Sequence, residues 1–147
     1  FYITAKSGSS SFNKLNLNSE WLKKRSRQFN TSINGYTKGI EKVNIITLDE
    51  YCEKNDLNNI DILKIDTQGN ELNVLKGSKK LLKNVKFIKL ELMLYDYYEK
   101  SYFFSDIESF LKKFDFKIFN ILEVQQNPVN FKTDWIDVLF YNTKTKF

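Results

Sequence analysis

Hydrophobic positions in the later part of the 147-residue chain fall into short runs that alternate between strand and helix spacing. From residue 43 onward the pattern predicts the order strand, helix, strand, helix, strand, helix, strand, strand. Strands are predicted to begin at Val43 and to span 59–66, 85–94, 116–124 and 135–142, and helices to begin at Thr47 and to span 70–84 and 105–114. Gly77 is expected to divide 70–84 into two short helices.

Two of the predicted helices start with capping-box spacing. Thr47 precedes Glu50, and Ser105 precedes Glu108, in each case by three residues. Residues 1–42 show no clear period, and we expect an irregular lead-in with a strand-like start and a helical turn near 19–24.

Alternating strands and helices predict an α/β fold in which a parallel sheet carries helices on its faces. The last two strands are joined by a loop of about ten residues that contains Pro128. Such a loop is too short for a crossover helix, so these strands should pair antiparallel. We therefore expect a mostly parallel sheet that ends in a C-terminal antiparallel hairpin.

Composition limits the chemistry that this chain can perform. It has one cysteine, Cys52, and no histidine, so a disulfide framework, histidine catalysis and histidine metal ligands are excluded. A lone cysteine suits a reducing compartment, and we expect a cytoplasmic location. No apolar run approaches the length needed to cross a bilayer.

The net charge of +5 is compatible with an anionic partner such as RNA. The basic residues Lys23, Lys24, Arg25 and Arg27 form the densest cluster. Lysines are otherwise spread along the whole chain, which favours a solvated face for this cluster. Nucleic acid is therefore not the favoured partner.

The predicted strand 59–66 carries charged residues within an apolar run. Lys64 and Asp66 share one face with Ile62, because side chains alternate along a strand. Asp66 stands at the carboxyl end of the strand, where ligands bind in open α/β sheets. The long stem of Lys64 allows it to pair with Asp66 and keep that side chain charged.

The residues after Asp66 predict a sharp turn into a helix. Gly69 permits the turn, and Glu71 falls in the first turn of the helix, where an acid complements the helix dipole. In a purely structural interpretation, Asp66 or Thr67 caps the helix and Lys64 extends to solvent. In a functional interpretation, Asp66 belongs to a ligand site. Residue patterns alone leave both open.

A second acid, Glu91, interrupts the apolar strand 85–94 near its carboxyl end. If the two strands are parallel neighbours, Asp66 and Glu91 lie on the same rim of the sheet. Paired acids there can orient a hydroxyl group, accept its proton or hold a divalent ion. Two acids alone do not establish a metal site, and we predict none.

Five segments of the chain match, in order, the typical motifs of one enzyme family. They are ITLDEYCEKN, IDILKIDTQGNELNVLKGSKKLL, KFIKLELMLYD, FSDIESFLKKFDFKIFNI and WIDVLFYN. Through them the chain resembles the FkbM-type methyltransferases from about Val43 to Asn142. It departs from the family at Thr67–Gln68, where Val–Glu is commonest, at Ser78 in place of alanine, and at Asp115 in place of glycine.

The resemblance implies a partial Rossmann-like class I methyltransferase sheet and S-adenosylmethionine as the methyl donor. The implied reaction methylates a hydroxyl of a sugar, a polysaccharide or a natural-product precursor. In that reaction Asp66 would orient or deprotonate the hydroxyl, with Glu91 as its partner. Lys64 would support Asp66, and Glu71 would position the loop.

The resemblance also implies a glycine-rich cofactor motif, and none of the five glycines forms a G-x-G. We expect the cofactor-binding part to precede Phe1. Residues 1–147 would then be the C-terminal portion of one methyltransferase domain, with a lead-in (1–42) and a family-like core (43–142), and would be inactive alone. A non-catalytic methyltransferase-like module and an RNA 2′-O-methyltransferase-like enzyme are the alternatives.

Overall fold

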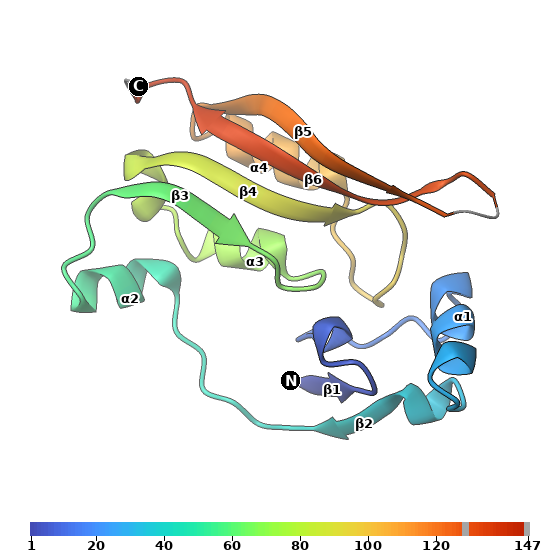
Figure 1. Ribbon diagram of the computed structural model, residues 1–147. Helices are drawn as coiled ribbons and strands as arrows, with labels where there is room; N and C mark the ends of the chain where they lie inside the picture. Colours follow the sequence, from blue (N-terminus) through green and yellow to red (C-terminus); the bar gives the residue numbers. More distant parts are fainter. Residues whose placement is uncertain (128–129, 146–147) are drawn as a thin grey trace.

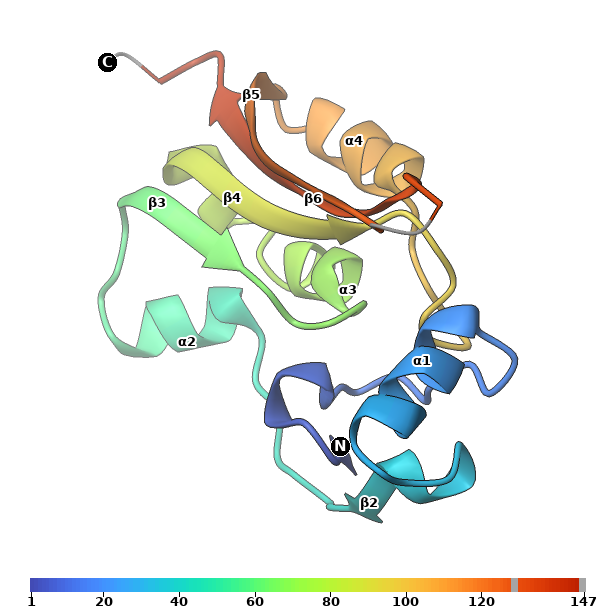
Figure 2. The same ribbon diagram turned by 45° about the vertical axis from the view of Figure 1, so that its right-hand side comes forward.

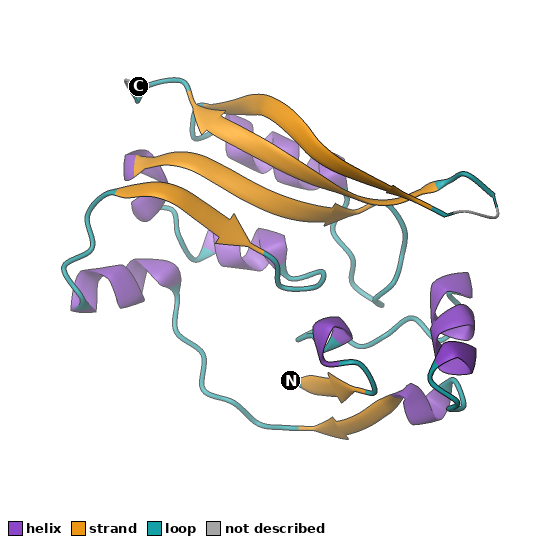
Figure 3. Cartoon of the chain, viewed as in Figure 1, coloured by secondary structure: helices purple, strands orange, loops and turns teal. Residues whose placement is uncertain are grey.

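The computed structural model describes residues 1–127 and 130–145, whose strands form one four-stranded sheet and one two-stranded sheet (Figures 1 and 3). Pro128 lies outside the described residues. In chain order the elements are β1 (Tyr2–Thr4), η1 (Ser7–Ser9), α1 (Glu20–Gln28), η2 (Asn34–Tyr36), β2 (Thr37–Ile40), α2 (Leu48–Lys54), β3 (Ile60–Ile65), α3 (Glu71–Lys76), η3 (Leu81–Asn84), β4 (Val85–Met93), α4 (Phe104–Lys112), β5 (Phe116–Gln126) and β6 (Thr133–Asn142).

The larger sheet has the strand order β3-β4-β6-β5. β3 and β4 pair parallel, whereas β6 pairs antiparallel with both β4 and β5. The predicted C-terminal hairpin is confirmed. The prediction of a mostly parallel sheet is wrong, because only one of the three ladders described in this sheet is parallel. β3, β4 and β5 do run in one direction, but β6 turns back and inserts between β4 and β5.

Helices cover one face of this sheet. In Figures 1 and 2, α3 and α4 lie on the same side of the strands. Ile88, Leu90 and Leu92 of β4 face these helices and are buried, whereas the alternate residues of β4 are partly exposed. The buried core therefore lies between the sheet and α3, η3 and α4, and the opposite face is the open face. An acid in an apolar strand is accommodated when it points to this open face.

The prediction of a strand that begins at Val43 is wrong. Residues 41–47 belong to no helix or strand of the described chain, and Ile45 is 79% exposed. An apolar run becomes a strand only where a neighbouring edge offers its peptide groups, and no described strand lies in register with this segment.

Helix boundaries follow local capping chemistry in two of three predicted cases. The Thr47 side chain accepts a hydrogen bond of 3.1 Å from the Glu50 amide at the start of α2. Gly77 ends α3 and separates it from η3, as predicted. The predicted capping box of Ser105 and Glu108 is wrong. α4 begins at Phe104, one residue before Ser105, and the Asp106 carboxylate accepts a 2.9 Å hydrogen bond from the Phe103 amide.

The lead-in is more regular than predicted. The expected helical turn near 19–24 is the start of the nine-residue α1, which Ser19 caps through the amide of Leu22. This segment lies beyond the carboxyl ends of β3 and β4 (Figures 1 and 2). It is attached there by a second buried cluster, which comprises Leu15, Leu22, Tyr36, Tyr97 and Tyr98.

None of the helices within residues 1–127 and 130–145 combines the length and the hydropathy that crossing a membrane requires.

Candidate functional site

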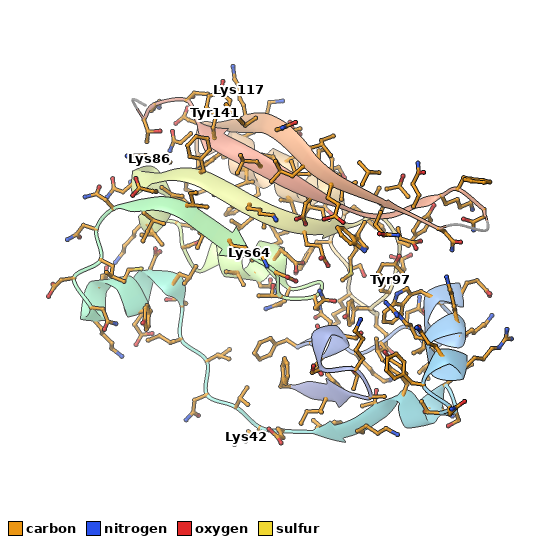
Figure 4. All side chains as sticks on the ribbon, in the orientation of Figure 1. Lys42, Lys64, Lys86, Tyr97, Lys117 and Tyr141 are labelled. Atoms are coloured by element: carbon orange, nitrogen blue, oxygen red, sulfur yellow. The ribbon has the colours of Figure 1, made fainter. Side chains whose placement is uncertain are left out.

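Asp66 follows the last residue of β3 and pairs with Lys64, as predicted. Lys64 Nζ lies 3.3 Å from Asp66 Oδ2. Lys64 extends from β3 (Figure 4), and 61% of its side chain and 34% of the Asp66 side chain are exposed. The apolar run 59–66 indicates a buried strand, but this face of β3 is exposed, and the Lys64–Asp66 pair is a surface ion pair of small energetic value.

The turn after β3 is organised by Glu71. Its Oε1 accepts hydrogen bonds from the Thr67 amide (2.9 Å), the Thr67 hydroxyl (3.2 Å) and the Gly69 amide (3.1 Å). Glu71 is only 6% exposed. The alternative in which Asp66 or Thr67 caps α3 is wrong, because Asn70 occupies the cap position and makes no side-chain cap bond. Glu71 instead binds the backbone of the preceding loop.

Gly69 is required by the shape of this turn. Its φ is +89°, in the region that favours glycine. A Cβ at this position would lie 2.8 Å from Cδ2 of the buried Tyr98 ring. The glycine thus allows the loop to approach the aromatic cluster closely.

Gln68 connects the two candidate acids. Its Nε2 donates to Asp66 Oδ1 at 3.0 Å and to Glu91 Oε1 at 3.1 Å. The hydroxyl of Tyr98 lies 3.3 Å from Gln68 Oε1, which is consistent with this orientation of the amide. Gln68 has a φ of +54°, which is uncommon for a residue other than glycine. Sequence reasoning did not select Gln68, although its place between Asp66 and Gly69 was a usable signal.

Glu91 lies beside this amide on β4. Burial raises the pKa of the Glu91 carboxyl above its ordinary value, and the nearby charge of Asp66 raises this pKa further, while the bond from Gln68 acts in the opposite direction. A carboxylate with a raised pKa is a better proton acceptor near neutral pH. The predicted proximity of Asp66 and Glu91 is confirmed through their shared partner.

A third acid, Asp137 of β6, lies directly across from Glu91 in the sheet. It is buried and pairs with Lys89, whose Nζ lies 2.5 Å from Asp137 Oδ2. The bond to Asp137 raises the pKa of Lys89. The motif WIDVLFYN contains Asp137, but its sequence does not predict a place in the site, because the position of Asp137 opposite Glu91 depends on where β6 inserts.

A cavity of about 330 Å³ opens next to these residues. Asp66, Thr67 and Gln68 form one wall, and the loop that includes Ser7 to Ser10 forms another, with the rings of Phe1 and Phe12. Its volume is within the range of small-molecule sites. A larger cavity of about 940 Å³ lies elsewhere, between α1 and the β5–β6 hairpin.

The basic cluster predicted to be solvated lies on α1. Lys24 and Arg27 are exposed, while Lys23 pairs with Glu20 and Arg25 binds Gln28. In the described part of the chain, no group of three or more Cys, Asp or Glu side chains is arranged to hold a metal ion.

Comparison with known families agrees with this geometry. The family model described as the methyltransferase FkbM domain matches residues 1–118 of the 147. The match includes residues 1–42, which the motifs alone had left outside the resemblance. No curated protein and no solved structure matches the chain. Because the family model covers most of its length, the chain belongs to the FkbM methyltransferase family.

Proposed function

We propose that this protein is an S-adenosylmethionine-dependent O-methyltransferase that acts on a hydroxyl of a sugar, a polysaccharide or a natural-product precursor. The observation that carries the proposal is the cluster of Asp66, Gln68 and Glu91 at the carboxyl ends of two parallel strands. Membership of a methyltransferase family supports the reaction class.

In this proposal, the acceptor enters the 330 Å³ cavity and its hydroxyl donates a hydrogen bond to Asp66. Gln68 holds Asp66 and Glu91 in fixed positions through its two N–H groups. Asp66 takes the hydroxyl proton as the oxygen is methylated, and Glu91, whose pKa is raised by burial, is its partner on β4. Orientation of the hydroxyl provides most of the rate enhancement.

S-adenosylmethionine supplies the methyl group when it is bound. The described residues do not fit the whole cofactor: Asp66 is the acid at the end of β3, but no G-x-G loop follows a strand. The cavity beside Asp66 is also at the lower end of the size range for such ligands. We therefore assign the described residues to the acceptor side and name no cofactor contact.

The test is Asp66→Asn, assayed by transfer of a radiolabelled methyl group from S-adenosylmethionine to the acceptor hydroxyl. Turnover should fall by about 10²- to 10⁴-fold. Asp61→Asn is a matched control, because Asp61 lies on the same strand and also pairs with a lysine, Lys86, at 2.7 Å. Unchanged turnover in a folded Asp66→Asn variant would remove Asp66 from the mechanism. An unmodified protein that transfers no methyl group would favour a non-catalytic module.

A further inference from the structure

Both tryptophans of the chain line the 940 Å³ cavity. Trp21 comes from α1, and Trp135 comes from the start of β6. The loop after β4 provides the third wall, which includes Tyr95 and Tyr97. Tyr97 lies beside α1 in Figure 4. Four aromatic side chains from three separate segments thus meet around one opening.

Part of this aromatic lining is held in place by the protein itself. The rings of Trp21 and Tyr97 lie 5.0 Å apart at 47°, and the Tyr97 hydroxyl donates to the carbonyl of Asp134 at 3.3 Å. Tyr97 is almost fully buried, whereas Tyr95 is 39% exposed. Trp21 is therefore fixed against Tyr97, Trp135 is half-buried, and Tyr95 is exposed, so Trp135 and Tyr95 present part of their rings to a ligand.

The polar lining of the cavity is rich in amides. Six amide side chains line it: Asn16, Gln28, Gln125, Gln126, Asn127 and Asn130. An amide offers both donors and an acceptor, as a sugar hydroxyl does. This match favours a ligand with many hydroxyl groups over one with a single charged group.

The charges around the cavity are balanced. Among the described lining residues, Lys24, Arg25 and Lys132 are basic. Three others, Glu20, Asp96 and Asp134, are acidic. A polyanion such as RNA requires an excess of positive charge, which this lining does not provide. Accessible rings, abundant amides and neutral balance together describe a site for a neutral carbohydrate, whose C–H faces pack on rings while its hydroxyls bind amides.

We propose that this cavity binds a neutral glycan chain, as the part of the acceptor that flanks the methylated sugar; this step rests on the function proposed above. Trp135 pairs in register with Met93, two residues beyond Glu91 on the same face of β4. Two residues along a strand span about 7 Å, a separation that a short oligosaccharide covers. A chain held on Trp135 therefore reaches the acid cluster.

The experiment measures binding, not catalysis. The whole chain is applied to an array of immobilised neutral glycans. A glycan that retains the protein is then titrated in solution while tryptophan fluorescence is recorded. At least one neutral glycan should retain the protein, and Trp135→Ala should weaken this binding by tenfold or more. Trp21→Phe leaves Trp135 as the sole tryptophan, whose emission should still change on binding. Tyr51→Ala removes an exposed ring on α2, outside the cavity, and should have no effect.

A second lining variant guards against misfolding of Trp135→Ala. Gln126→Ala removes an exposed amide and should weaken binding about two- to twelvefold, since each amide contributes a hydrogen bond of about 0.5–1.5 kcal/mol. The proposal is overturned if no neutral glycan on the array binds the protein, or if neither Trp135→Ala nor Gln126→Ala weakens glycan binding. It is also overturned if the protein binds single-stranded RNA with a steep salt dependence and binds no glycan.

The same variants separate this proposal from the proposed function. Asp66→Asn should lower methyl transfer as described above and leave glycan binding unchanged, because Asp66 lines the other cavity. If retention persists but Asp66→Asn has full turnover, the catalytic proposal fails and the glycan site stands. If Asp66→Asn loses turnover but no glycan is retained, the glycan site fails alone.

Discussion

Gln68 Nε2 donates a 3.1 Å hydrogen bond to Glu91 Oε1 and joins the turn after β3 to the neighbouring strand β4. The same nitrogen binds Asp66 at 3.0 Å. A neutral amide thus lies between two carboxylates and donates one N–H hydrogen bond to each. Glutamate is commonest at this position in the family that the motifs resemble, so the amide is a particular feature of this chain.

Gln68→Glu should destabilise the protein at neutral pH by about 1–3 kcal/mol, because two donated hydrogen bonds are lost and a third carboxylate enters the cluster. The loss should shrink at acidic pH, where the carboxylates become protonated. Chemical denaturation at both pH values measures this difference. Gln125→Glu, at an exposed position of β5, is the control. An equal loss at both pH values would contradict the electrostatic explanation.

Gly69→Ala should destabilise the fold by about 1–3 kcal/mol, because a side chain is strained at the φ of +89° and its Cβ would contact Tyr98. Gly39→Ala is the matched control, since nothing lies within 4 Å of a Cβ built there. That control should be neutral or stabilising by up to about 1 kcal/mol. Urea unfolding measures the stability of both variants. If both lose the same free energy of unfolding, strain and the contact with Tyr98 at Gly69 do not explain the loss.

Features of the fold that depend on neighbouring residues could be predicted from the sequence. Alternation along a strand predicted that Lys64 and Asp66 share a face, and the ion pair confirms it. The cap at Thr47 and the helix end at Gly77 depend on neighbouring residues, and both are confirmed. The parallel pairing of β3 with β4 also followed from the helix between them.

Features set by distant segments could not be predicted in the same way. The insertion of β6 between β4 and β5 places Asp137 opposite Glu91, and no local pattern encodes this register. The Val43 segment has strand propensity but finds no partner among the described strands. The role of Gln68 depends on β4, which places Glu91 within hydrogen-bond distance of its side-chain amide.

Glu91→Gln tests the electrostatics of the site through pH. The pKa of Glu91 is raised above 4.5 in the folded chain, so the folded state holds this proton more tightly than the unfolded state. The contribution to stability is complete below 4.5 and is lost as pH rises through the raised pKa. Glu91→Gln should therefore flatten the stability profile over this range and raise stability at neutral pH.

The stability of both proteins is followed by thermal unfolding across acidic to neutral pH, with the exposed Glu41→Gln variant as control. Methyl transfer by Glu91→Gln should fall less than methyl transfer by Asp66→Asn, because Glu91 acts as the partner of Asp66 and does not line the cavity that receives the acceptor. A variant with an unchanged pH profile would show that Glu91 does not titrate as proposed.

Residues 1–147 alone should bind S-adenosylmethionine weakly, because no G-x-G loop is present to hold it. Isothermal titration calorimetry of this chain should give no saturable heat. A class I methyltransferase that has a G-x-G loop provides the comparison and should bind the cofactor. Tight binding by the 147 residues would place the cofactor contacts within them and would overturn the assignment of these residues to the acceptor side.

Glu71→Ala should loosen the turn that carries Asp66. Its carboxylate accepts from the amides of Thr67 and Gly69, and the alanine variant leaves both without that partner. Each unsatisfied buried group costs about 1–3 kcal/mol, so the free energy of unfolding should fall by roughly 2 kcal/mol or more. Glu71→Gln keeps one acceptor oxygen and should lose less.

Hydrogen exchange of the Thr67 and Gly69 amides distinguishes this local effect from general destabilisation. Both amides should exchange faster in Glu71→Ala at denaturant concentrations where the core amides of β4 are unchanged, because the turn opens before the sheet. Glu50→Ala also removes an acid from the first turn of a helix, but this acid is exposed and pairs with Lys54. Its loss should cost about 0.5 kcal/mol or less. If the Thr67 and Gly69 amides are protected equally in Glu71→Ala and the unmodified chain, Glu71 does not hold this turn, and the position of Asp66 must depend on Gln68 alone.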